Sequence, residues 1–242
     1  MFSIFKKKNT LRTMEWLAVD IHSHLLPGLD DGSPNIEETV KLIKRLHELG
    51  YTRFYCTPHI FTELYPNNLN TILPALQKTK AALIEANLDV TIGAAAEYMV
   101  DDTFYVTDDL LTLPGNYILI EMSYLNETPD IEKIVLELKA TGYKVILAHP
   151  ERYLFYRTDK KRLERFKEMG VFFQLNLLSV TGYYGKEVKK AANYLIGREF
   201  YDFASSDLHH EKHLDALAKV IQDGSLHHKL GAYPFKNKEL FL

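Results

Sequence analysis

The stretch Asp20-Ile21-His22-Ser23-His24 decides how the whole chain is interpreted. The preceding residues Trp16-Leu17-Ala18-Val19 are typical of a short buried strand, and alternate residues of a strand point to the same side. His22 and His24 therefore project together at the end of this strand. Two imidazoles placed in this way can bind one metal ion.

The turn that follows, Leu29-Asp30-Asp31-Gly32, carries two carboxylates that can add oxygen ligands to such a site. A buried histidine, an exposed histidine and an acidic turn would explain the same residues equally well. The choice depends on the rest of the chain, which supplies further residues of the ligand type at the same end of the expected fold.

Length and composition leave room for one α/β barrel or two small domains, because 46% of the 242 residues are hydrophobic. No linker indicates a division, so we expect a flexible basic arm over residues 1–14 and one domain over residues 15–242. The net charge of −3 gives no general attraction to nucleic acid. Without a transmembrane segment or a secretory signal in the sequence, we expect a cytoplasmic protein. The oligomeric state is left open.

The single cysteine, Cys56, excludes a framework of intramolecular disulfides and lies in an apolar run typical of a core. A cysteine-dependent phosphatase needs an arginine six positions later, where this chain has Thr62. A glycine-rich loop ending in Lys-Ser or Lys-Thr is also missing from the sequence. Neither cysteine nor P-loop phosphate chemistry is therefore supported.

Apolar runs alternate with amphipathic patterns along the chain. We expect strands over residues 16–19, 51–57, 90–96, 117–120, 143–148, 171–175 and 200–204, and helices over 33–49, 69–87, 130–141, 159–169, 185–196 and 211–223. Ser33 is expected to cap the first helix, with Pro34 at its first position. The alternation predicts an α/β fold with a parallel sheet of about seven strands, close to the eight of a full barrel.

Polar residues favour a barrel over the alternative, an open doubly wound sheet. Histidines and carboxylates lie at or just beyond the C-terminal ends of six strands: His22, His24, His59, Glu97, Glu121, His149, Asp207 and His209. In a barrel these ends converge on one mouth, whereas the edge and central strands of an open sheet lie far apart. The ligand set exceeds the needs of one ion and suits Mn, Fe or Zn, so we expect a cluster of two or three metals.

Seven motifs are recognisable together: Asp20-Ile21-His22-Ser23-His24, Leu29-Asp30-Asp31-Gly32, Thr57-Pro58-His59, Gly93-Ala94-Ala95-Ala96-Glu97-Tyr98, Leu119-Ile120-Glu121-Met122, Ala148-His149-Pro150-Glu151-Arg152-Tyr153 and Ser206-Asp207-Leu208-His209. With them the chain resembles the polymerase and histidinol phosphatase (PHP) family. More closely, it is similar to the bacterial metal-dependent protein tyrosine phosphatases of capsule and exopolysaccharide operons. The likeness covers nearly the whole chain from Ala18 onward.

The resemblance implies a distorted, TIM-like (β/α)7 barrel of the PHP type that holds three metals, usually manganese or iron. Carried over position by position, one metal would take His22, His24, Glu97 and Asp207; a second would share Glu97 and add Glu121 and His149; the third would take Asp31, His59 and His209.

Arg152 is the catalytic residue that we expect in addition to Asp207 and His209 of the ligand set. A guanidinium beside a metal cluster can hold phosphate oxygens bidentately and stabilise the charge that develops during hydrolysis. The alternative role for Arg152 is a surface ion pair with Glu151. Relatives also use an arginine after the last metal histidine, where this chain has His210-Glu211-Lys212-His213.

Aromatic residues follow several of the expected ligands: Phe61, Tyr65, Tyr98, Tyr124, Tyr153 and Tyr156. Such rings could stack on the phenyl ring of a substrate, although loop aromatics more often pack the loops themselves. The resemblance implies a protein tyrosine phosphatase whose substrate is a tyrosine kinase with a flexible tail, involved in exopolysaccharide or capsule synthesis. Three alternatives stay open: a small-molecule phosphatase of the histidinol phosphate type, a metal-binding module without catalysis, and a nuclease.

Overall fold

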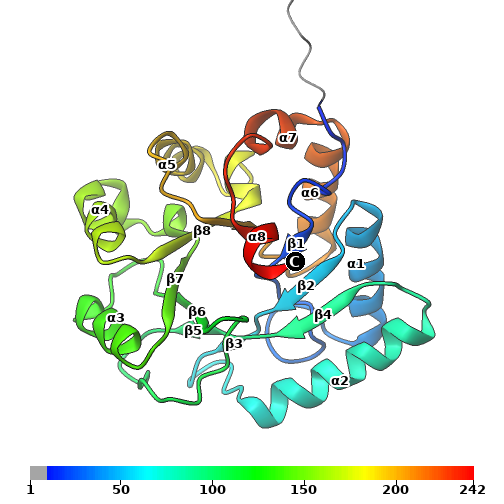
Figure 1. Ribbon diagram of the computed structural model, residues 1–242, viewed down its shortest axis with the longest axis horizontal. Helices are drawn as coiled ribbons and strands as arrows, with labels where there is room; N and C mark the ends of the chain where they lie inside the picture. Colours follow the sequence, from blue (N-terminus) through cyan, green and yellow to red (C-terminus); the bar gives the residue numbers. More distant parts are fainter. Residues whose placement is uncertain (1–9) are drawn as a thin grey trace, which may run out of the picture.

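A computed structural model describes residues 10–242, in which helices surround a central set of short strands (Figure 1). The strands are β1 (Val19–Asp20), β2 (Arg53–Cys56), β3 (His59–Ile60), β4 (Thr91–Ala94), β5 (Glu97–Met99), β6 (Tyr117–Glu121), β7 (Lys144–Ala148), β8 (Phe172–Asn176) and β9 (Phe203–Ser205). The α-helices are α1 (Ile36–Glu48), α2 (Leu69–Glu85), α3 (Ile131–Ala140), α4 (Lys160–Glu168), α5 (Lys186–Gly197), α6 (Glu211–Gln222), α7 (Ser225–Leu230) and α8 (Asn237–Phe241). Short 3-10 helices are η1 (Pro150–Arg152), η2 (Phe155–Arg157) and η3 (Leu177–Val180).

All strand pairs are parallel, in one sheet of order β1-β2-β4 and another of order β3-β5-β6-β7-β8-β9. The pairs β2–β4 and β3–β5 are successive parts of one pairing, because the Ala95 N–H donates to the Cys56 carbonyl and the Glu97 N–H donates to the Pro58 carbonyl. Pro58 has no N–H for a ladder, so the two strands are interrupted just after Cys56 and Ala94, and the short strands β3 and β5 follow beyond the expected ranges 51–57 and 90–96. The strands thus occupy seven positions, in sequence order.

The first and last strands are joined by a few hydrogen bonds instead of a ladder. The His24 N–H donates to the Leu208 carbonyl and the Asp207 N–H donates to the His22 carbonyl, both at 2.9 Å. Within residues 10–242 the strand hydrogen bonds therefore do not run unbroken around a closed barrel. The sequential order lacks the reversal of a doubly wound sheet, so the open-sheet alternative is wrong and the fold is a distorted barrel.

Alternation along the strands separates an inner from an outer core. In β6, Tyr117 and Leu119 belong to the inner cluster, whereas Ile118 and Ile120 pack outward with the helices. The full inner cluster is Val19, Ile21, Ala95, Leu113, Tyr117, Leu119, Ile146, Ala148, Phe203 and Phe241. Glu121 follows Leu119 at the next inward position, so its carboxylate lies inside the barrel at the C-terminal end of the strands.

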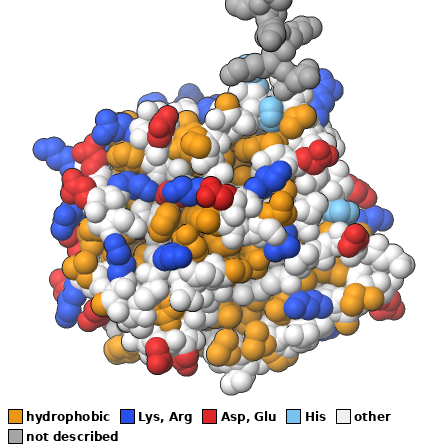
Figure 2. Space-filling view, viewed as in Figure 1, with side chains coloured by type: hydrophobic (Ala, Val, Ile, Leu, Met, Phe, Trp, Pro, Cys, Tyr) orange, Lys and Arg blue, Asp and Glu red, His pale blue; other side chains and the backbone are white. Residues whose placement is uncertain are grey.

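Helix α8 covers the opposite end of the barrel, and it lies near the centre of the view in Figure 1. The Phe241 ring packs on Tyr117 at 5.5 Å and on Phe203 at 5.4 Å between ring centroids. Tyr117 begins β6, so α8 fills the end at which the strands start and leaves the other end open. On this face, Figure 2 shows charged side chains of both signs interspersed with apolar ones.

Several expected boundaries differ in the structure. The expected strand 16–19 is reduced to β1 at Val19–Asp20, because the Leu17 and Ala18 N–H groups both donate to the Met14 carbonyl in a turn. Helix α1 is capped by Asn35, whose side chain accepts the Glu38 N–H at 2.9 Å, because Ser33 is held by a bond from its N–H to the His24 carbonyl. Met14, placed in the arm by sequence, is buried and its N–H donates to the Leu49 carbonyl. Residues 1–9 lie outside the described residues, so the flexible arm stays a prediction. Nowhere in residues 10–242 is there a helix with the length and apolar character to cross a bilayer.

Candidate metal centre

The structure brings all nine expected ligand residues together at the open end of the barrel. Their ligand atoms form four overlapping groups, each within 4.8 Å: His24, Asp31, His59 and His209; His22, His24 and Asp207; His22, Glu97 and His149; and His59, Glu97 and Glu121. Most of these side chains are buried. Groups of this composition could each hold a metal ion.

His22 and His24 form the innermost part of the site. Their Nε2 atoms lie 3.3 Å apart. Glu97 Oε2 lies 3.2 Å from the first and 3.4 Å from the second, and Asp207 Oδ1 lies 3.3 Å and 3.4 Å from the same atoms. Four potential ligand atoms from distant parts of the chain therefore surround one point.

The other nitrogens of these two imidazoles face hydrogen-bond acceptors. His22 Nδ1 lies 2.9 Å from Gln174 Oε1, and His24 Nδ1 lies 2.7 Å from Asp30 Oδ2. The Gln174 amide is fixed in this orientation because its Nε2 donates to the Leu175 carbonyl. The protons of the neutral imidazoles therefore lie on Nδ1, and both Nε2 lone pairs face the carboxylates. Lone pairs and anionic oxygens that converge in this way form a site that a cation can occupy.

Electrostatics within the buried site favour positive charge. Burial alone would lower the pKa of His22, but attraction to Glu97 and Asp207 raises that pKa to about 9. Burial likewise opposes the charge on the two carboxylates, yet the imidazoles hold the pKa of both well below the usual range. The field that retains a proton in this place also attracts a metal ion, which can replace that proton.

His59, His209 and Asp31 form the outer part of the site. Asp31 Oδ1 lies 3.6 Å from His59 Nε2 and 3.5 Å from His209 Nε2. Burial and repulsion from His24 lower the pKa of His209 to about 4, so this imidazole is neutral and able to donate a lone pair. His59 Nδ1 also lies 2.9 Å from Glu121 Oε1, a contact that the expected division of ligands does not include.

Two of the site residues have left-handed backbone conformations, His149 with φ of 33° and Asp207 with φ of 49°. Such conformations cost a non-glycine residue about 1–3 kcal/mol and concentrate at functional sites. His149 Nε2 lies 3.1 Å from Glu97 Oε1, so the unusual turn after β7 brings its ring to the central carboxylate. No sequence pattern predicts these conformations.

Arg152, on η1, lies beside the central group. Its Nη1 donates to Asp207 Oδ2 at 2.8 Å, and its guanidinium packs between the rings of Tyr124 and Tyr184, at 4.6 Å and 4.4 Å from their centroids. The alternative ion pair with Glu151 is wrong. The Glu151 carboxylate is buried, where it accepts the Asn176 N–H and the hydroxyl of another residue, Tyr201.

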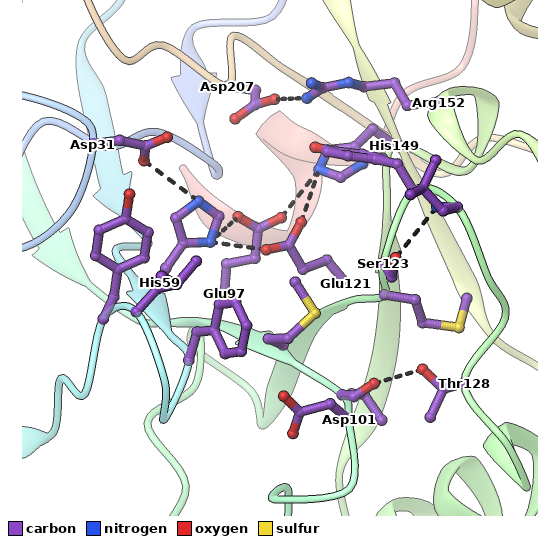
Figure 3. A pocket seen from close by; sticks show the side chains of 18 of the residues that line it. Asp31, His59, Glu97, Asp101, Glu121, Ser123, Thr128, His149, Arg152 and Asp207 are labelled. Carbon is purple, nitrogen blue, oxygen red and sulfur yellow. Dashed lines mark hydrogen bonds and ion pairs between the residues drawn. The ribbon is translucent and has the colours of Figure 1, made fainter.

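A cavity of about 970 Å³ opens over the site (Figure 3). It is lined by His59, Glu97, Glu121, His149, Arg152 and Asp207 among others. Of the aromatics proposed to face a substrate, Phe61, Tyr65 and Tyr124 line the cavity. Tyr98, Tyr153 and Tyr156 do not, because they are buried in the core.

Cys56 is also buried in the core, and burial raises the pKa of its thiol to about 12. A thiol of this kind is not ionised near neutral pH and cannot serve as the nucleophile. The exclusion of cysteine-dependent phosphatase chemistry is thus confirmed by the environment of the residue.

Sequence reasoning missed two polar residues of β8 that orient the site. Besides Gln174 against His22, Asn176 Nδ2 donates to Asp207 Oδ2 at 2.8 Å. Both are fully buried in an otherwise apolar strand. A buried polar side chain needs a hydrogen-bond partner. The two amides in the otherwise apolar run Phe172–Asn176 could therefore have been recognised from the sequence as residues that contact a polar site.

Replacing Gln174 with methionine is expected to weaken metal binding by about 10- to 100-fold, because His22 then loses the acceptor that fixes its Nδ1 proton. Metal titration of the chelator-treated protein measures the effect, and circular dichroism checks that the variant is folded. Unchanged metal affinity in a folded variant would contradict the orienting role.

The family model for capsular polysaccharide synthesis proteins, CpsB/CapC, matches residues 18–223 of this chain. The chain belongs to the CpsB/CapC family. The tyrosine-protein phosphatase YwqE of Bacillus subtilis (strain 168) is 27% identical over 198 residues, which covers 80% of this chain and 78% of YwqE. The tyrosine-protein phosphatase CpsB of Streptococcus pneumoniae is 26% identical over 240 residues, covering 93% and 95%.

Two solved structures are similar to this chain, and one of them agrees with the CpsB/CapC assignment. A chain from the crystal structures of YwqE and CpsB, described as unique metal-dependent tyrosine phosphatases, superposes with a TM-score of 0.79 at 25% identity and covers 91% of both chains. An amidohydrolase from Mycoplasma synoviae superposes with a TM-score of 0.56 at 10% identity, covering 94% of this chain and 88% of its own. The second likeness shows the fold alone.

Proposed function

We propose that this member of the CpsB/CapC family is a metal-dependent protein tyrosine phosphatase that hydrolyses phosphotyrosine monoesters. The observation that carries the proposal is the convergence of imidazole nitrogens and carboxylate oxygens beneath a cavity that also contains Arg152. The names of the relatives as tyrosine phosphatases support the substrate.

The donor set suits a cluster of manganese ions, since Mn2+ accepts mixed nitrogen and oxygen ligands. In this proposal the ligands of three ions come from His22, His24, Glu97 and Asp207; from Glu97, Glu121 and His149; and from Asp31, His59 and His209. Glu97 has its two oxygens against different imidazoles, as expected of a carboxylate shared between two ions. When bound, the metal ions neutralise the phosphate and activate water for attack on phosphorus.

Arg152 binds the non-bridging oxygens of the phosphate in this mechanism. Its guanidinium is held by the two tyrosine rings and by Asp207, so little ordering is needed when substrate arrives. Asp207 and His209 complete the catalytic group. The His209 Nδ1 donates to the Asp207 backbone carbonyl at 2.9 Å, which fixes its ring with Nε2 toward the outer part of the site.

We propose that the protein acts in the cytoplasm on a protein substrate, specifically the flexible tail of a tyrosine kinase that regulates capsule or exopolysaccharide synthesis. The description of the family as capsular polysaccharide synthesis proteins supports this pathway. The cavity, open to solvent beside exposed Tyr124 and Leu125, offers space for a peptide and not only for a small phosphate ester.

Chelation is expected to abolish phosphate release from phosphotyrosine peptides, and added Mn2+ is expected to restore it. Bound metal at about a thousandfold over its Kd should also raise Tm by roughly 10 °C. The assay compares Mn2+, Fe2+ and Zn2+, with histidinol phosphate and single-stranded DNA as rival substrates. Full activity without metal would contradict the mechanism, and faster turnover of histidinol phosphate or DNA would contradict the substrate.

A further inference from the structure

The cavity extends well beyond the candidate metal centre. Figure 3 shows Asp101 and Thr128 at the opposite end from Arg152 and Asp207, with Glu97 and Glu121 between them. The volume of about 970 Å³ lies at the upper end of the range for ligand pockets, about 300–1,000 Å³. One phosphorylated tyrosine side chain would therefore occupy only the part near the metal centre.

The far part of the cavity is lined by large apolar side chains, which we call the apolar groove. They come from the loops after β3 and β6 and from the end of β5: Phe61, Leu64, Met99, Met122, Leu125 and Pro129. Within the described residues, Arg152 is the one lysine or arginine among the lining residues, and it lies at the metal end. The part of the chain that the structure describes therefore gives the groove an apolar surface without lysine or arginine side chains.

Two leucines of the groove are exposed to an unusual degree, Leu64 at 65% and Leu125 at 67%. They lie on different loops that hydrogen bonds hold in place. Phe61 and Tyr65 exchange backbone N–H to carbonyl bonds of 3.0 Å and 2.8 Å, and Thr128 Oγ1 donates to the Val100 carbonyl at 2.5 Å. Exposed apolar side chains that border a cavity mark a binding surface.

The end of the groove is acidic. Asp101 and Asp102 both line the cavity there, and Asp102 is exposed. Because residues 10–242 place no lysine or arginine beside them in the cavity lining, these carboxylates favour a positive side chain on a peptide bound in the groove.

We infer that the apolar groove binds the polypeptide next to the phosphotyrosine and selects a large apolar side chain there, with a lysine or arginine beyond it. This inference rests on the proposed function. The cavity is continuous with the metal centre, so a chain whose phosphate lies beside Arg152 has its neighbouring residues against Leu64 and Leu125. Selection then depends on groove contacts, and the chemical step depends on the metal centre.

The test compares phosphotyrosine peptides by steady-state kinetics with Mn2+ present. One series places leucine or alanine at each neighbouring position in turn, and a second places lysine or glutamate one position further out. We expect leucine to raise kcat/KM by about tenfold at one position, mainly through KM, and lysine to be preferred to glutamate beyond it.

Variants of the groove residues test whether the preferences for leucine and lysine arise in the apolar groove. The double change Leu64→Ser and Leu125→Ser is expected to remove the preference for leucine, and Asp102→Asn is expected to reduce the preference for lysine. The rate on p-nitrophenyl phosphate, which is too small to reach the groove, should not change. Leu136→Ser is the matched control, since Leu136 is 56% exposed on α3 and does not line the cavity.

The outcomes separate this inference from the proposed function. Equal rates on all phosphotyrosine peptides, or a leucine preference that survives the double change, would overturn the inference and leave the phosphatase activity standing. A complete lack of hydrolysis of phosphotyrosine esters in the presence of metal would overturn both.

Discussion

Replacing Glu97 with glutamine is expected to lower kcat/KM toward phosphotyrosine peptides by about a thousandfold or more. Glu97 is 1% exposed, and its two oxygens lie within 3.4 Å of His22, His24, His59 and His149. Glutamine has nearly the same shape but no charge, so it removes a shared metal ligand without opening a cavity. Kinetics with Mn2+ and metal content by elemental analysis measure the loss.

His22→Ala provides an independent test of the same site. It is expected to cost as much activity as Glu97→Gln, and the two changes together should cost little more than either, because both remove the same metal environment. Glu164→Gln is the matched control, since this carboxylate is on α4 and pairs with Arg198 at the surface. Folded Glu97→Gln protein with the full rate and full metal content would refute the mechanism.

The convergence of the candidate ligands could be predicted because the C-terminal ends of parallel strands meet at one mouth of a barrel. His22 and His24 lie just beyond β1 on the same side, and Glu121 continues the inward positions of β6 after Leu119. Glu97 was expected to end a strand but begins β5, since Pro58 interrupts the neighbouring ladder. Its expected place beside the other candidate ligands was still correct, because Glu97 lies two positions after the inward residue Ala95 and so on the same side.

Other features of the site depend on tertiary contacts that leave a weaker trace in the sequence. Gln174 contacts a histidine that lies 152 positions earlier, and Asn176 contacts an aspartate 31 positions later. Asp30 was interpreted as a possible ligand beside Asp31, but its carboxylate orients His24 and accepts the His59 N–H. The distinction between a ligand and a residue that orients it is set by distances, which a motif does not contain.

The two ends of the barrel also differ in how well the sequence predicts them. The open end carries histidines and carboxylates, which have few roles in a core other than paired or metal-bound ones. The closed end is filled by Tyr117, Phe203 and Phe241, ordinary apolar residues that fit any core. Helix α8 was therefore not predicted, although it seals the end opposite the site.

Arg152→Ala is expected to lower kcat/KM by about 100- to 1,000-fold, the usual cost of removing one group that stabilises transition-state charge. Arg152→Lys should recover little of this loss, because lysine keeps the charge but not the planar fork that stacks between Tyr124 and Tyr184. The loss should fall mainly on kcat with phosphotyrosine peptides.

Metal content decides whether Arg152 acts on the phosphate or through Asp207. The ion pair of 2.8 Å between them means that removing the guanidinium could also release a ligand side chain. Asn176 donates to the same oxygen, Asp207 Oδ2, and stays in place in the variant. We therefore expect full metal content in Arg152→Ala, with Arg198→Ala, an exposed arginine, as the control. A variant that loses metal in proportion to activity would make Arg152 a positioning residue and leave the phosphate without a cationic side chain.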